Sequence, residues 1–247
     1  LKGSDNGGGG QLYSMAIDPA GNVYVTGQRY QNGGGGQLYA ARYDPGTGDL
    51  VWEGTYMPGG PNYPRGNAIA FDGAGNVYVG GWAQNYSGGP MGNNNFGLIA
   101  EFSPAGTLVW ATSMTGAQYG TSIAVDGFNN AYLVGTTMDN GGVGGDKALV
   151  ITKYDASHNI VFSRTYAVAP PELEEAVAVF NSSNNSLFVA AGGSSPLIVD
   201  RIDGDTGDVI AEGVCSAPYT KVQIGGMAVD AAGNVYVAFD YPTGPTA

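Results

Sequence analysis

The chain of 247 residues contains little cysteine, little histidine and few basic side chains. Its single cysteine, Cys215, excludes a disulfide framework, a zinc site built from thiolates and a CxxC redox pair. Its single histidine, His158, excludes a histidine-rich metal centre. Lys and Arg number 9 against 21 Asp and Glu, a net charge of −12, so we expect neither nucleic acid nor an anionic lipid surface as a partner.

Long apolar runs and helical periodicity are missing as well. No segment approaches the ~18 apolar residues of a membrane-spanning helix, and no window of about 11 residues has a clean helical period, so we expect no membrane insertion and almost no helix. Glycine is abundant instead, with 43 residues in the chain. A hydrophobic fraction of 43% with 16 tyrosines excludes disorder. The composition is typical of an exported microbial protein, which predicts an extracellular or cell-surface location.

An internal repeat organises the whole chain. Five segments share one pattern, in which a small residue stands two positions before a turn, at Ala16, Ala70, Ala124, Ala178 and Ala228. The first three steps are of one length, 54 residues, and the last is 50 residues, which follows from these five numbers. Constancy of this kind indicates one structural unit per step.

Each unit reads as four short strands. In the first copy these are residues 15–17, 23–25, 38–43 and 50–54, rich in β-branched and aromatic residues and separated by Gly, Asn, Asp and Pro. Tandem four-stranded units of this length predict an all-β fold, a β-propeller. We expect residues 1–240 to form one domain, with blades starting near residues 14, 68, 122, 176 and 226, and a Pro/Gly tail over residues 241–247.

The repeat resembles that of the bacterial seven-bladed β-propeller repeat family, whose consensus is close to aVDsaGNvYVtG. Residues 18–27, 72–81 and 230–237 match it well, residues 126–135 match with Asn-Asn in place of Gly-Asn, and the fourth copy departs, with Phe180 at the Asp position. Residues 43–52 also resemble the D-x-x-T-G-x-x-x-W turn of quinoprotein propellers. The resemblance implies a propeller fold and an exported or surface protein, and leaves the activity open.

The blade count predicts an open edge. Four blades are complete, whereas the fifth has two strands before the tail. We therefore expect either a longer parent chain or a partner, which could be a second copy, covering a strand edge that would otherwise favour aggregation.

Alternation of strand direction assigns the loops to two faces. Turns between strands one and two and between strands three and four are short, whereas the loops on the opposite face are long and dissimilar, and variable loops on a regular scaffold commonly bind ligands. The predicted binding residues on this long-loop face are all aromatic: Tyr30, Tyr56, Tyr63, Trp82, Tyr86, Tyr119 and Tyr166. The alternative is that these loops are solvated spacers whose aromatic rings fold back onto the blades.

The repeated aspartates, starting with Asp18, are interpreted as turn caps that accept backbone N–H groups, with Gly-Asn supplying positive φ. Asp203, Asp205 and Asp208 have a spacing reminiscent of a calcium loop, but they occupy a turn between strands three and four, so calcium is a weak candidate and no other cofactor is expected. Three sequons, at Asn85, Asn181 and Asn184, are weak glycosylation candidates.

Few side chains are suited to catalysis, and we assign no catalytic residue. His158 is interpreted as a solvated turn residue and Cys215 as a small buried side chain. An acidic cluster is formed by Glu172, Glu174 and Glu175. It is interpreted either as a solvated loop or as a site of acid–base catalysis on a glycan.

Three functional hypotheses follow from the sequence. The first is a non-enzymatic structural or interaction subunit of a surface assembly. The second is a module that binds a glycan or another ligand through the long-loop face, and the third is an enzyme of the lyase or quinoprotein type.

Overall fold

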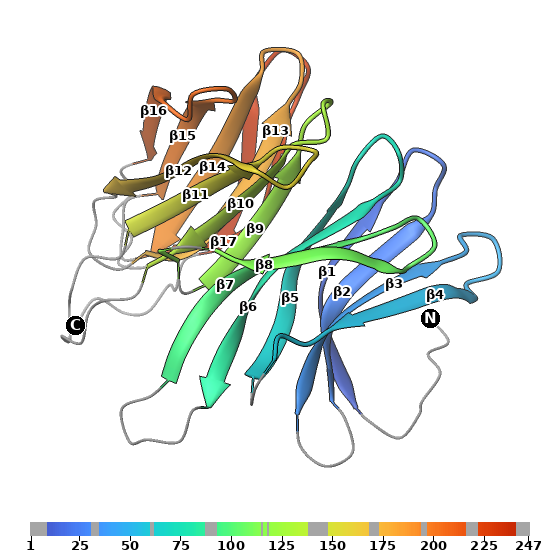
Figure 1. The fold of residues 1–247 in the computed structure, drawn as a ribbon. Coiled ribbons are helices and arrows are strands. Elements are labelled where there is room, and N and C mark those ends of the chain that lie inside the picture. Colours follow the sequence, from blue (N-terminus) through green and yellow to red (C-terminus); the bar gives the residue numbers. More distant parts are fainter. Residues whose placement is uncertain are drawn as a thin grey trace.

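The computed structural model describes residues 9–30, 35–59, 62–86, 93–114, 116–117, 119–137, 148–167, 173–193, 197–215 and 222–240. Within them the regular elements are antiparallel strands arranged in successive sheets (Figure 1). The first sheet contains β1 (Gly10–Ile17), β2 (Val23–Tyr30), β3 (Gly36–Tyr43) and β4 (Leu50–Tyr56), and the second contains β5 (Asn62–Phe71), β6 (Val77–Tyr86), β7 (Asn93–Phe102) and β8 (Leu108–Ser113). The third contains β9 (Tyr119–Val125), β10 (Ala131–Thr136), β11 (Ala148–Tyr154) and β12 (Ile160–Ala167). The fourth contains β13 (Leu173–Asn181), β14 (Ser186–Gly193), β15 (Leu197–Asp203) and β16 (Val209–Cys215), and the fifth pairs β17 (Gln223–Val229) with β18 (Val235–Asp240).

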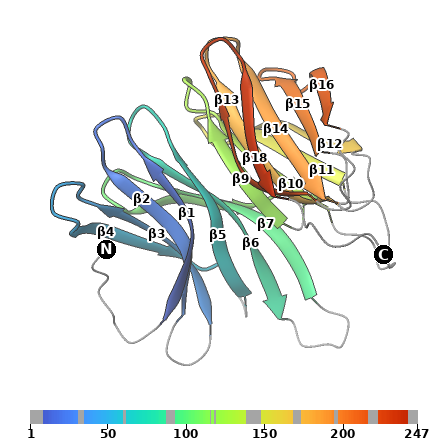
Figure 2. The same ribbon diagram turned by 180° about the vertical axis from the view of Figure 1, so that it is seen from behind.

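The order of strands within each sheet confirms the predicted all-β blades. Each four-stranded sheet runs in chain order from its first strand to its fourth, and every neighbouring pair is antiparallel. The first strands β1, β5, β9, β13 and β17 contact one another in succession, so they line the inner side of the row of blades (Figure 2). Among the described residues, no helix is long and apolar enough to cross a membrane.

Aspartate caps fix the turn between the first and second strands. The Asp18 carboxylate accepts the backbone N–H groups of Ala20 and Asn22, and the Asn22 amide donates to its second oxygen at 2.7 Å. Gly21 has φ of 87°, which glycine adopts without steric cost. The same bonds recur in the second, third and fifth sheets, so the turn-cap interpretation is confirmed. In the first sheet β1 ends at Ile17 and β2 begins at Val23, as predicted on the two sides of this turn.

The fourth copy needs a correction at Phe180. Phe180 pairs with Leu187 in the ladder, and Asn181 follows it at the turn, where its Oδ1 accepts the N–H of Ser183. Phe180 stacks on Tyr132 with ring centroids 5.1 Å apart. Asn181, and not Phe180, therefore occupies the Asp position, because the extra residue of this turn shifts the alignment by one.

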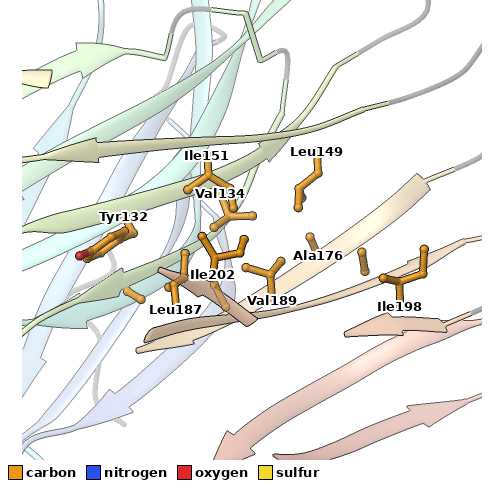
Figure 3. Close-up of a cluster of buried hydrophobic side chains, with 12 residues drawn as sticks. Tyr132, Val134, Leu149, Ile151, Ala176, Leu187, Val189, Ile198 and Ile202 are labelled. Atoms are coloured by element: carbon orange, nitrogen blue, oxygen red, sulfur yellow. The ribbon is translucent and has the colours of Figure 1, made fainter. Parts of the chain in front are cut away.

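Apolar side chains are buried mainly between adjacent sheets. The cluster drawn in Figure 3 joins the third and fourth sheets, with Tyr132, Leu149 and Ile151 on one side and Leu187 and Ile202 on the other, all fully buried. Similar clusters join the first sheet to the second and the second to the third. Each blade is therefore stabilised mainly by its neighbours, as expected for a repeat architecture.

An aromatic side chain of the fourth strand covers the next blade's turn at each of three interfaces. The residue that receives the ring has positive φ in every case. The pairs are Trp52 with Gly106, Trp110 with His158 and Phe162 with Gly207.

Two assignments from the sequence are wrong here. His158 is half-buried, stacks on Trp110 with centroids 4.5 Å apart and lies 2.5 Å from the Glu101 carboxylate, so it is an inter-blade contact and not a solvated turn residue. Cys215 is exposed and not buried, because the outer strand β16 is exposed along its whole length.

Candidate functional site: an axial pocket on the long-loop face

Each first strand carries a register shift near its beginning, where the strand approaches the long-loop face. In the first three sheets the unpaired residues are Tyr13, Asn67 and Thr121, which stand 54 residues apart. A bulge of this kind re-aims a side chain and increases the local twist. The three side chains that the bulges re-aim line one common pocket.

The pocket has a volume of about 610 Å³ and lies at the inner strands, on the long-loop face. Five blades contribute to its wall, which combines aromatic, amide, hydroxyl and charged groups. The described lining residues are Tyr13, Arg65, Asn67, Trp82, Tyr119, Thr121, Thr136, Glu175, Ala176, Val177 and Ile224. Its size and mixed lining are those of a small-molecule site.

Arg65 lies between aromatic rings of two blades. It stands directly opposite Trp82 in the β5–β6 ladder, and its guanidinium carbon lies 4.3 Å from the centroid of the Trp82 ring. On the preceding blade, the ring centroid of Tyr13 lies 5.1 Å from the same atom. Contacts of this type stabilise the cation by about 0.5–2 kcal/mol.

Trp82 also contacts an aromatic residue of the third blade. Its ring meets the edge of Tyr119 with centroids 5.0 Å apart and an interplanar angle of 83°. The Tyr119 hydroxyl accepts a hydrogen bond from the Asn95 amide, which holds this ring in place. Glu175, from the fourth blade, supplies a carboxylate, one oxygen of which accepts the N–H of Ile224 at 3.2 Å.

The structure brings two of the seven predicted aromatic residues together in the pocket, namely Trp82 and Tyr119. Tyr30 is 40% exposed at the end of β2 and does not line it. Tyr56 packs against the core between the first two blades, and burial raises its pKa. Tyr166 donates to the Gly207 carbonyl, and burial raises its pKa to about 12.

Tyr63 is half-buried on β5 and does not line the pocket, and the side chain of Tyr86 lies outside the described part of the chain. All seven residues lie on strands and not in loops, because the ladders continue well beyond the apolar segments that predicted them. The prediction that these residues belong to loops was therefore wrong.

Asp203, Asp205 and Asp208 form the predicted turn between strands. Backbone N–H groups of Thr206 and Asp205 donate to the Asp203 carboxylate and lower its pKa. Asp205 and Asp208 instead form ion pairs with the third blade. Asp205 pairs with Lys153, and the Asp208 carboxylate lies 2.8 Å from the Arg164 guanidinium. No group of three or more Asp, Glu, His or Cys side chains in the described part of the chain is arranged to hold a metal, so the calcium hypothesis gains no geometric support.

The sequons have unequal surroundings. Asn181 is buried, and its amide donates to the Asp230 carbonyl, which weighs against glycan attachment in the folded protein. Asn184 is half-buried, and the side chain of Asn85 lies outside the described part. Glu172 and the side chain of Glu174 lie outside it as well.

Sequence reasoning missed Arg65, Tyr13 and Asn67. The 54-residue period could have aligned Tyr13, Asn67 and Thr121, because they occupy one repeat position whose residue type changes from blade to blade. The bulge that turns them inward has no sequence signature that the repeat pattern reveals. The contact of Arg65 with Trp82 depends on the register of the β5–β6 ladder.

No protein-family model matches the chain, and no curated protein is similar to it in sequence. Solved structures do match. A protein of unknown function from Bacteroides caccae superposes with a TM-score of 0.57 and 12% identity, over 93% of this chain and 70% of that one. The Dos1 propeller superposes with a TM-score of 0.58 and 14% identity, over 92% and 54%, and the WD40 domain of Neurospora crassa Pan2 with 0.54 and 9%, over 93% and 60%.

These likenesses and the repeated antiparallel blades define the class of protein: the chain has a β-propeller fold. It spans between about half and two thirds of the length of the Dos1 and Pan2 structures that it matches. At identities this low the likeness concerns the fold alone.

Proposed function

We propose that this protein is a non-enzymatic, exported binding module that holds a carbohydrate ligand in the axial pocket. The observation that carries the proposal is the convergence of Arg65, Trp82 and Tyr119 around a volume of about 610 Å³. Flat aromatic rings beside a few fixed polar groups suit a sugar, whose C–H faces pack on the rings while its hydroxyls hydrogen-bond.

Variation among the copies supports a ligand site at this place. The positions that build the blades keep the same residue type, as at Ala16, Ala70 and Ala124, whereas the pocket position changes from Tyr13 to Asn67. A scaffold role alone would not require a different side chain in each copy. We therefore place carbohydrate binding ahead of the interaction-subunit hypothesis that the sequence favoured.

The charged groups of the pocket support binding over hydrolysis. Among its described lining residues, Glu175 supplies the carboxylate, and the other charged side chain is Arg65. Hydrolysis of a glycosidic bond ordinarily uses a pair of carboxyl groups.

A glycan array followed by calorimetric titration tests the proposal. We expect saturable binding to at least one oligosaccharide, and Trp82→Ala should weaken it about tenfold or more, which corresponds to about 1.4 kcal/mol. Tyr30→Ala is the matched control, because this aromatic side chain lies outside the pocket, and it should leave the affinity unchanged. Thermal unfolding of both variants verifies that they fold. Absence of binding across the array, or equal losses in the two variants, would refute the proposal.

A second candidate function, an interaction subunit of a surface assembly, is favoured by the fifth sheet. Tyr236 of β18 is 61% exposed, whereas its counterparts Tyr24, Tyr78, Tyr132 and Phe188 are exposed by 5% or less. Tyr24, Tyr78 and Tyr132 belong to the clusters that are buried against the following blade. The fifth sheet thus presents a blade-type face that suits a protein partner or a second copy.

The interaction hypothesis is tested by light scattering and cross-linking over a range of protein concentrations. We expect concentration-dependent association that Tyr236→Ser weakens. The control is Phe128→Ser, since Phe128 is 80% exposed on a turn away from this face. A monomer at every concentration, with no cross-linked species, would contradict it.

A further inference from the structure

Arg65 differs from the other arginines of the described residues because its guanidinium has neither an ion pair nor a hydrogen bond, whereas Arg42 and Arg201 donate to neutral side-chain oxygens. Arg29 pairs with Glu53 at 2.7 Å, and Arg164 pairs with Asp208. No described carboxylate forms an ion pair with Arg65, no hydrogen bond among the described residues uses its guanidinium, and its buried Nε has no partner. An arginine held in this way in an acidic protein retains its donors for a ligand.

The two flanking rings contact the guanidinium of Arg65 without occupying its hydrogen-bond donors. Trp82 and Tyr13 lie against the group at 4.3 and 5.1 Å from its central carbon. Neither contact is a hydrogen bond, so neither uses an N–H donor of the cation. Two parallel N–H groups match the two oxygens of a carboxylate, and such charge-assisted pairs are about twice as strong as neutral hydrogen bonds.

Three further polar groups of the pocket, those of Asn67, Thr121 and Glu175, present acceptor oxygens. One N–H of the Asn67 amide donates to the Gly120 carbonyl at 2.9 Å, and its Oδ1 can accept a hydrogen bond from a ligand. The Thr121 hydroxyl donates its proton to the Val134 carbonyl, so its oxygen is left to accept a hydrogen bond. Together with the Glu175 carboxylate, these oxygens can accept hydrogen bonds from the O–H groups of a ligand.

We propose that the axial pocket selects a carbohydrate bearing a carboxylate, a uronic-acid sugar, with Arg65 as the receptor of the carboxylate. The ligand's carboxylate supplies the acceptors that Arg65 lacks, and its hydroxyls supply the donors that Asn67, Thr121 and Glu175 lack. A phosphate group would satisfy Arg65 but would leave the oxygens of Asn67, Thr121 and Glu175 without hydroxyl donors. The inference rests on the proposed carbohydrate binding and specifies the class of sugar.

Matched acid and ester probes test the selection. Calorimetric titrations would compare trigalacturonate with its full methyl ester, and trimannuronate with its full methyl ester, because each pair differs only in the charge and the acceptors of the carboxyl groups. We expect at least one acid to bind about tenfold or more tightly than its ester. Equal binding of acid and ester in both pairs would overturn the inference.

Two substitutions separate recognition by Arg65 from a structural effect. Arg65→Gln should lower the affinity for the acid about tenfold or more beyond any loss for the ester, so that the preference for the acid disappears. Arg65→Lys keeps the charge without the planar fork, so it should retain part of the preference. Equal losses for acid and ester in both variants would contradict the assignment, and urea unfolding shows whether either variant fails to fold.

The outcomes also separate this inference from the proposed function. Binding of neutral sugars that depends on Trp82 but shows no preference for an acid would leave carbohydrate binding intact and refute the role of Arg65. Absence of binding by the acids, the esters and the array sugars would refute both.

Discussion

Replacing Asp200 by Asn should stabilise the protein at neutral pH and do so much less in acid. Asp200 lies on β15, is 7% exposed, and its buried Oδ1 has no hydrogen-bond partner. Burial, together with the charge of Glu212 directly across the β15–β16 ladder, raises its pKa from the ordinary 3.8 to about 6. The ionised carboxylate is therefore a destabilising group in the folded state.

The sign and magnitude follow from linkage between protonation and folding. Since the folded-state pKa of Asp200 lies above the unfolded-state value, the folded protein binds more protons between about pH 4 and pH 6, and its stability falls as the pH rises through this range. Each pH unit of displacement is equivalent to about 1.4 kcal/mol, so above pH 6 ionised Asp200 costs at most about 3 kcal/mol. Below pH 4 this cost disappears.

Urea unfolding of the wild type and Asp200→Asn at pH 4 and pH 7.5 measures the effect. The change in unfolding free energy caused by the substitution should be about 2–3 kcal/mol more favourable at pH 7.5 than at pH 4, a difference from which the amide's own burial cost cancels. Glu212→Gln removes the smaller of the two causes that raise the pKa of Asp200. It should therefore reproduce only part of this difference in unfolding free energy. An identical effect of Asp200→Asn at both pH values would refute the reasoning.

Two further predictions concern the contacts between blades. Gly106→Ala should destabilise the protein by about 1–3 kcal/mol, because the new Cβ would lie 2.7 Å from the Trp52 ring, whereas Gly48→Ala, with similar φ but open space, should cost less in the same urea titration. Tyr132→Phe should cost about 1–2 kcal/mol, because it removes a buried hydroxyl 2.8 Å from a backbone carbonyl, while Tyr236→Phe, at an exposed position, should change the unfolding free energy by less than about 0.5 kcal/mol. Equal effects within either pair would contradict the packing described for these interfaces.

The fold was predictable from sequence because the same sequence pattern occurs in five copies. The caps at Asp18 and its counterparts determine each turn locally, so the pattern of residues is sufficient to place the strands. Errors arose where one copy departs from the others. The extra residue in the turn after Phe180 shifted the alignment, and the burial of His158 depends on Trp110 of another blade.

The candidate site was predictable only in part. Trp82 and Tyr119 stand out as aromatic residues near the long-loop face, and both line the pocket. Arg65 could not be assigned, because its surroundings come from Trp82 on the neighbouring strand and Tyr13 on the preceding blade. Contacts across blades depend on the twist and bulges of the sheets, which local sequence does not specify.

A crystal structure of the protein with trigalacturonate or trimannuronate, whichever binds more tightly, tests the central claim most directly. We predict density for the sugar in the axial pocket, with its carboxylate within hydrogen-bond distance of the Arg65 guanidinium and its ring against Trp82. Density for the sugar elsewhere, with the pocket unchanged, would contradict the account.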